Sequence, residues 1–284
     1  MLQLVSFTHN LNAKRSSPPV SFTSQNDSAA IYYALSTDRR RNSNSGPDIY
    51  AQLDQYFSEA AREIALGAPL DDITLIQYLV PSFNRYHAGA ESANRLLNYI
   101  NRHYVKHAID EDRGWLRLVD ALESLAKDPP KESSKETISK IMKEKKLQEL
   151  KKWGYIEGGS QEKMALAEAC AEAASPTDRV VPISSLAHRR FRTEVMEPLL
   201  ISPKIKGKSK AKHKIPKIPA RPNPALPRGR LARATKELLE GSSVTEDERQ
   251  NLASGLAKAL QITGFRSDIP VRKTLDKYLA AGTA

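Results

Sequence analysis

Apolar residues recur at helical spacing through most of this chain, and this periodicity restricts the fold more than any other feature. The segment from Pro47 to Leu66 shows the pattern in full, because its large apolar side chains fall on one helical stripe: Ile49, Leu53, Tyr56, Phe57, Ala60 and Ile64. Such a stripe is typical of a helix that buries one face in a core. Runs with the alternating pattern of a strand are scarce, so the sequence predicts an all-α fold.

Helix start and stop signals set the expected boundaries. Capping residues or prolines precede several periodic segments and glycines follow them, as with Thr245 before residues 246–262 and Gly264 after them. Pro81 falls inside one pattern, where we expect a kink because proline removes a backbone hydrogen bond. The predicted helices span residues 28–37, 47–66, 71–86, 91–109, 115–125, 135–153, 161–174, 184–197, 229–239, 246–262 and 270–280.

Positive charge is concentrated in one segment. The net charge is +11, and Lys204 to Arg230 holds ten Lys or Arg and no Asp or Glu, so removing those ten charges leaves about +1 elsewhere. Residues 201–228 also hold six prolines, which predicts a semi-rigid basic linker. Beyond it, residues 229–284 are expected to form a small three-helix module that folds and moves independently. Residues 1–26 are polar and Ser-rich and are predicted to be disordered.

One stretch of the chain carries a specific family signal. Residues Asn94 to Lys106 read NRLLNYINRHYVK, followed by Asp110, Glu111 and Asp112. This run resembles the fifth-helix signature of cullins, the elongated scaffolds of ubiquitin ligases, whose pattern is roughly N-R-L-F-x-Y-L-N-R-H-W-V-K-R-x-x-D-E-G. The residues before it resemble the preceding cullin helices more loosely, with LIQYLVPSFNRY from Leu75 standing where the family has L-x-x-Y-x-x-x-W-x-x-Y.

Two placements of the next cullin helix remain open. It is either residues 115–125 or residues 185–199, SLAHRRFRTEVMEPL, which resemble the family's T-L-A-L-V-x-W-R-x-x-L-F-x-P-L better. We prefer the second placement, which makes residues 27–200 a cullin-repeat-like helical domain with an insertion over 113–183. The chain has no counterpart of the later cullin repeats or of the C-terminal domain that binds a RING protein. The resemblance therefore implies a truncated, divergent cullin N-terminal region.

The resemblance also implies a partner and a set of contact residues. In cullins the second and fifth helices of the first repeat dock a Skp- or BTB-type adaptor. Carried over, the expected contacts are Tyr32 on the second helix and Leu97, Asn101 and Tyr104 on the fifth. Leu97 and Tyr104 also lie on the apolar stripe of that helix, so burial in the core is an equally open interpretation.

Other functional signals are weak. His103 and His107 lie four residues apart, but no third ligand is in register, so we predict no metal site. No cofactor-binding motif and no group of catalytic residues is recognisable, so we predict no other cofactor and no enzymatic activity. No apolar stretch approaches the roughly 20 residues of a membrane span. A single cysteine suits a reducing compartment, so the expected location is the nucleus or cytoplasm.

The resulting functional hypothesis is a non-catalytic adaptor-binding module in ubiquitin-dependent protein degradation. Two alternatives stand beside it: a degenerate cullin fragment without a partner, and a nuclear nucleic-acid-associated protein. The second would use the basic segment, as a polyanion contact or as a signal for a nuclear-import receptor. That segment carries its charge on alternating lysines: Lys204, Lys206, Lys208, Lys210, Lys212 and Lys214.

Overall fold

The computed structural model describes residues 45–123, 135–201, 229–241 and 244–282, and every regular element in these ranges is helical. The prediction of an all-α fold is therefore confirmed. Predictions for residues 1–44, including the helix over 28–37, and for residues 202–228 of the linker lie outside the described residues. The helices are α2 (Ser45–Leu66), α3 (Asp72–Leu96), α4 (Asn98–Ile100), the π-helical turn η2 (Asn101–Val105), α5 (Lys106–Asp110), α6 (Leu118–Glu123), α7 (Lys135–Lys152), α8 (Gln161–Ala174), α9 (Ile183–Phe191), the π-helical turn η3 (Arg192–Met196), α10 (Glu197–Leu200), α11 (Arg230–Glu240), α12 (Glu246–Ile262) and α13 (Pro270–Gly282).

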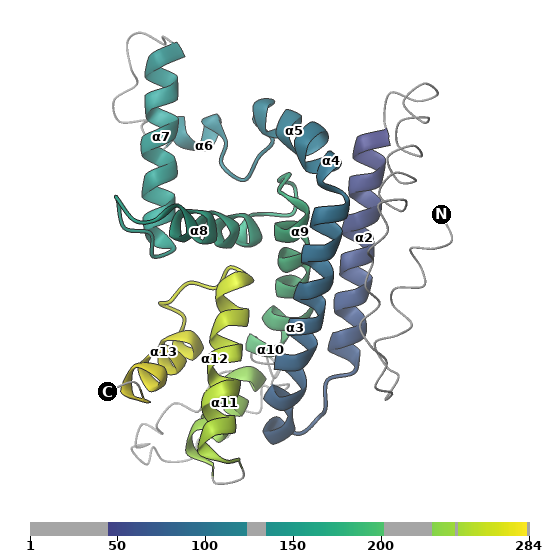
Figure 1. Ribbon diagram of the computed structural model, residues 1–284, viewed down its shortest axis with the longest axis vertical. Helices are drawn as coiled ribbons and strands as arrows, with labels where there is room; N and C mark the ends of the chain where they lie inside the picture. Colours follow the sequence, from purple (N-terminus) through teal and green to yellow (C-terminus); the bar gives the residue numbers. More distant parts are fainter. Residues whose placement is uncertain (1–44, 124–134, 202–228, 242–243, 283–284) are drawn as a thin grey trace, which may run out of the picture.

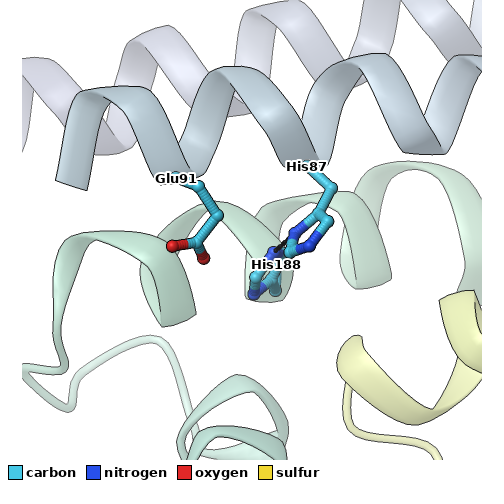
Figure 2. Close-up of side chains that lie close together, drawn as sticks. All are labelled: His87, Glu91 and His188. Atoms are coloured by element: carbon cyan, nitrogen blue, oxygen red, sulfur yellow. Dashed lines mark hydrogen bonds between the residues drawn. The ribbon is translucent and has the colours of Figure 1, made fainter. Parts of the chain in front are cut away.

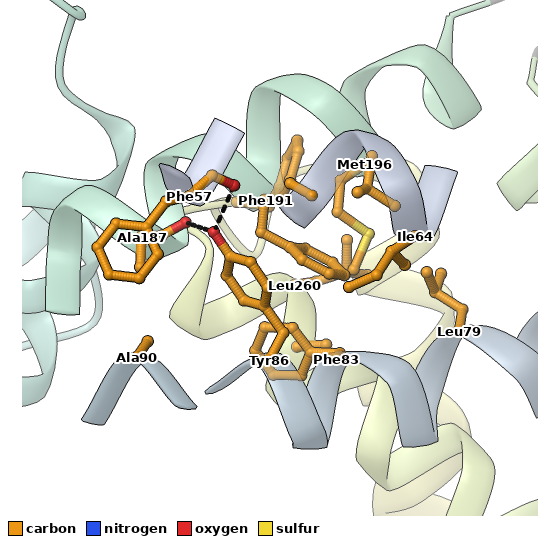
Figure 3. Close-up of a cluster of buried hydrophobic side chains, with 14 of the residues drawn as sticks. Phe57, Ile64, Leu79, Phe83, Tyr86, Ala90, Ala187, Phe191, Met196 and Leu260 are labelled. Atoms are coloured by element: carbon orange, nitrogen blue, oxygen red, sulfur yellow. Dashed lines mark hydrogen bonds between the residues drawn. The ribbon is translucent and has the colours of Figure 1, made fainter. Parts of the chain in front are cut away.

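Helix α9 packs against both α2 and α3, which follow one another in the sequence, and these three helices form the centre of the fold (Figure 1). Their facing side chains are buried, including Phe57 of α2, Phe83 of α3 and Phe191 of α9. The Tyr86 hydroxyl ties the three helices together, since it lies 3.1 Å from the Phe57 carbonyl oxygen and 2.9 Å from that of Ala187 (Figure 3). None of the described helices is both long and apolar enough to span a membrane.

Helix α3 is longer than the sequence predicts. We expected a kink at Pro81 and a separate helix from residue 91, but α3 continues through both positions to Leu96. Packing explains the continuity, because Leu79, Val80 and Phe83 around the proline are all buried. Their burial offsets the roughly 3 kcal/mol that an interior proline costs. The chain leaves the α-helical conformation only at Leu97, where φ is −100° and ψ is 22°.

The segment formed by α9 and η3 packs along α2, and α9 also packs against α3. Of the two placements left open, this is the one that packs against α2 and α3, and polar contacts fix it there. Arg190 pairs with Asp54, and Arg62 lies 2.9 Å from the carboxylate of Glu194. Helices α6, α7 and α8 extend to one side of this centre (Figure 1). That residues 113–183 are an insertion relative to cullins stays a prediction.

The three C-terminal helices form where they are predicted, but the expectation of an independent module is wrong. Helices α11 and α12 pack directly on α3, and their apolar side chains belong to the same core as the central helices. The reason is that α3 has a second apolar side, where Ile76 and Val80 require cover. Gly255 of α12 approaches so closely that a Cβ there would lie 2.5 Å from a methyl group of Val80. Asp72 adds ion pairs with Arg230 and Arg233.

Candidate functional site

Two of the predicted adaptor contacts face the interior. Leu97 is only 9% exposed and belongs to the hydrophobic core. Asn101 is held by two hydrogen bonds: its side-chain NH2 donates to the Asn94 side-chain oxygen at 2.7 Å, and its own oxygen accepts the Ile183 backbone N–H at 3.1 Å. That N–H belongs to the first residue of α9, so Asn101 caps a neighbouring helix. Leu97 and Asn101 therefore position helices, and Tyr32 lies outside the described residues.

Tyr104 packs against the edge of the hydrophobic core, but it is only partly buried, and its ring is held on several sides. The ring centroid lies 5.2 Å from that of Tyr50 at an angle of 52°. Gly46 covers another part, where an added Cβ would lie 3.3 Å from the Tyr104 Cβ. The guanidinium carbon of Arg113 lies 5.9 Å from the ring centroid, within the range of a cation–π contact. The aromatic side chain is thus fixed in place with part of its surface still open.

Arg113 extends this group into a connected surface cluster. Its guanidinium donates to the Glu111 carboxylate at 2.7 Å, and the same carboxylate lies 3.2 Å from Nδ1 of His107. The hydrogen bond from Arg113 lowers the pKa of Glu111, so the acid is ionised at neutral pH. We refer to Tyr104, His107, Glu111 and Arg113 together as the Tyr104 surface. Its charges are largely paired with one another, so it presents an aromatic ring within a nearly neutral frame.

The turn after α5 holds this surface in position. Asp112 adopts a left-handed backbone conformation with φ of 59°, and its carboxylate accepts the Leu118 N–H at 2.5 Å. The backbone N–H of Arg113 donates to the Ala108 carbonyl, and its carbonyl accepts the Val180 N–H, both at 2.9 Å. The Arg113 side chain therefore projects from a backbone that is bonded on both sides.

The second half of the signature run contains a π-helical turn, Asn101–Val105. A π-helical turn changes the angular offset between residues before and after it, and such turns are frequent at functional sites. Regular α-helical spacing predicts that Tyr104 lies on the same side as Leu97 and Asn101. The Tyr104 ring instead lies against Tyr50 and Gly46 of α2 and against Arg113, which follows it in the chain. The charged residues after the signature, Glu111 and Arg113, were the only available signal for this grouping.

The other predicted site residues are also accounted for. The lysines from Lys204 to Lys214 lie outside the described residues. His103 and His107 have separate neighbours, since the His103 ring lies 4.2 Å from that of Tyr99 and His107 pairs with Glu111. The fold also brings together a group of potential metal ligands that the sequence does not predict.

That group consists of His87, Glu91 and His188, whose potential ligand atoms all lie within 4.8 Å of one another. The four-residue spacing of His87 and Glu91 was a visible signal. The position of His188 was not, because it depends on how α9 packs against α3.

Comparisons with protein-family models, with curated proteins and with solved structures each found no match. The cullin resemblance therefore rests on the signature run and on the looser similarity of the residues before it.

Proposed function

We propose that this chain is a non-catalytic docking module that binds a Skp- or BTB-type adaptor through the Tyr104 surface, in the context of ubiquitin-dependent protein degradation. The observation that carries the proposal is a partly exposed tyrosine, held in place by its neighbours, at the position that the signature assigns to adaptor contact. The residues proposed to touch the adaptor are the members of the Tyr104 surface. Leu97 and Asn101 support that surface from within.

The chemistry of the surface suits a protein partner. Tyrosine and arginine are enriched among the residues that dominate protein–protein binding energies. The Tyr104 ring is already fixed by Tyr50 and Gly46, so little side-chain entropy is lost when a partner covers it. Because Glu111 is paired with Arg113, the surface carries little unbalanced charge, and binding should depend only weakly on salt.

Arg113→Ala is the sharpest test. The Arg113 side chain is 48% exposed, and the hydrogen bonds of its backbone do not depend on the side chain, so this variant should fold normally. If Arg113 is a dominant contact, its removal should cost about 2 kcal/mol, which weakens binding roughly 30-fold. Tyr104→Ala would also remove packing on Tyr50, so it is less specific.

Arg102→Ala is the matched control. Arg102 is exposed and lies two residues from Tyr104, which places it on the far side of the same helical stretch. Affinities of the full chain for purified Skp-type and BTB-type adaptors are measured by isothermal titration calorimetry at low and high salt. Equal losses for Arg113→Ala and Arg102→Ala, or binding that disappears at high salt, would contradict docking by the Tyr104 surface.

A second proposal rests on the concentration of ten basic residues between Lys204 and Arg230. It is that this segment contacts a polyanion or an import receptor while the helical part docks the adaptor. Deleting residues 204–228 should then remove nearly all DNA affinity and leave adaptor binding unchanged. DNA binding by the deleted protein at physiological salt would show that a helical surface binds nucleic acid instead.

A further inference from the structure

A buried histidine of α9 lies directly against a histidine of α3. Nδ1 of His87 lies 2.9 Å from Nε2 of His188, and Glu91 is one helical turn after His87. Figure 2 shows His87 and Glu91 extending from the same side of α3, on which His188 also lies. Helices α3 and α9 thus place two imidazole nitrogens and one carboxylate oxygen within 4.8 Å of one another.

The imidazole nitrogens that would bind an ion are paired with each other. His188 is only 3% exposed, its Nε2 lies against Nδ1 of His87, and its other ring nitrogen, Nδ1, is buried without a hydrogen-bond partner. Imidazole binds metals in its neutral form, and burial disfavours a charged ring.

We propose that His87, Glu91 and His188 bind one zinc ion, which links α3 to α9. Two histidines and a glutamate form a known zinc ligand set that leaves a fourth position for water. Zinc–ligand bonds of about 2.0–2.2 Å put tetrahedral donors about 3.3–3.6 Å apart. The two histidine nitrogens must therefore separate by only about half an ångström. Glu91 is half-buried at the edge of the site, so its side chain has room to adjust.

The charges around the site are compatible with a divalent cation. The Glu91 carboxylate offsets half of the zinc charge, and the neutral imidazoles add none. Lys258 is the cation that acts on His87 from α12, and its long side chain can turn away when the ion binds. The site is independent of the Tyr104 surface, so the zinc proposal does not depend on the proposed function.

The test is zinc binding by the full chain after the competing histidines have been removed. The chain has six histidines, so replacing His9, His103, His107 and His213 by alanine leaves only His87 and His188. This background protein is titrated with Zn²⁺ alone by isothermal titration calorimetry, and its thermal midpoint is recorded with and without zinc. We expect one equivalent of zinc per chain and a higher midpoint with zinc.

Glu91→Gln and His87→Gln are then introduced separately into the background protein. Both positions are half-buried, and both replacements keep a polar side chain, so folding should be retained and is checked by circular dichroism. Each should weaken zinc binding more than about 100-fold, beyond the 10–100-fold loss typical of a residue that only supports a ligand. No zinc binding by the background protein, or unchanged affinity in either folded variant, would overturn the proposal and leave a hydrogen-bonded histidine pair.

Discussion

The stability of the central helices should depend strongly on the hydroxyl group of Tyr50. This hydroxyl donates to the Val181 carbonyl at 2.9 Å and accepts the Val181 N–H at 3.0 Å, across 131 residues of sequence. Val181 is fully buried and lies in the extended residues just before α9. Its two backbone groups therefore depend on one side chain for hydrogen bonding, and burial raises the pKa of Tyr50 to about 12, so the hydroxyl stays protonated.

Tyr50→Phe removes only the oxygen and keeps the ring against Tyr104. The change leaves a buried N–H and a buried carbonyl without a partner, and each such group costs about 1–3 kcal/mol. We expect the free energy of unfolding to fall by about 2–4 kcal/mol. Tyr86→Phe is the matched control, because the Tyr86 hydroxyl contacts carbonyls that already lie within helices α2 and α9. Its loss should cost only about 1 kcal/mol, the net value of one hydrogen bond.

Urea unfolding followed by circular dichroism measures both variants under the same conditions. A loss for Tyr50→Phe that is smaller than the loss for Tyr86→Phe would refute the reasoning. It would mean that the segment before α9 is not held by Tyr50, and that the packing of α9 on α2 has another cause.

Three further outcomes are expected. Burial raises the pKa of Glu172 from 4.5 to about 7, so the folded protein keeps a proton that the unfolded chain releases. The free energy of unfolding should therefore fall by about 3 kcal/mol as the pH rises from about 4.5 to 7. Glu172→Gln should remove this pH dependence, as measured by urea unfolding. Gly89→Ala should stabilise the protein by about 0.5–1 kcal/mol, because the added Cβ would meet nothing within 4 Å. Gly255→Ala should destabilise the protein, because the added Cβ would overpack against Val80, and equal effects of the two substitutions would refute the close approach of α12 to α3. Trypsin should cut first within residues 204–228. The two fragments should still elute together in size-exclusion chromatography, because α11 and α12 pack on α3, and separate elution would disprove the shared core.

The sequence predicts helix boundaries well where a neighbouring residue caps the helix. Residues 246–262 form α12 as expected, because the Thr245 side chain accepts the Glu248 N–H at its start. Residues 161–174 form α8, where Ser160 caps Lys163 in the same way. These caps depend on residues within one turn, so the sequence contains the necessary information.

Features set by packing were not predictable in this way. No glycine or proline marks Leu97, where α3 ends, and Pro81 suggested a break that buried neighbours prevent. The composition of the Tyr104 surface also depends on packing and backbone conformation. Tyr104 was identified from its motif, but its association with Arg113 depends on a π-helical turn and on the conformation of Asp112. The docking of α12 on α3 joins residues more than 150 positions apart, which no local pattern reports.

The central claim is that the Tyr104 surface is where a partner docks, and hydrogen–deuterium exchange of the full chain tests it most directly. Exchange is measured with and without a purified Skp-type or BTB-type adaptor at saturating concentration. We expect the slowed exchange on adaptor binding to be concentrated in residues 101–118, which include η2, α5 and the turn at Asp112. Slowed exchange concentrated in α11 to α13, or no change with either adaptor, would contradict it.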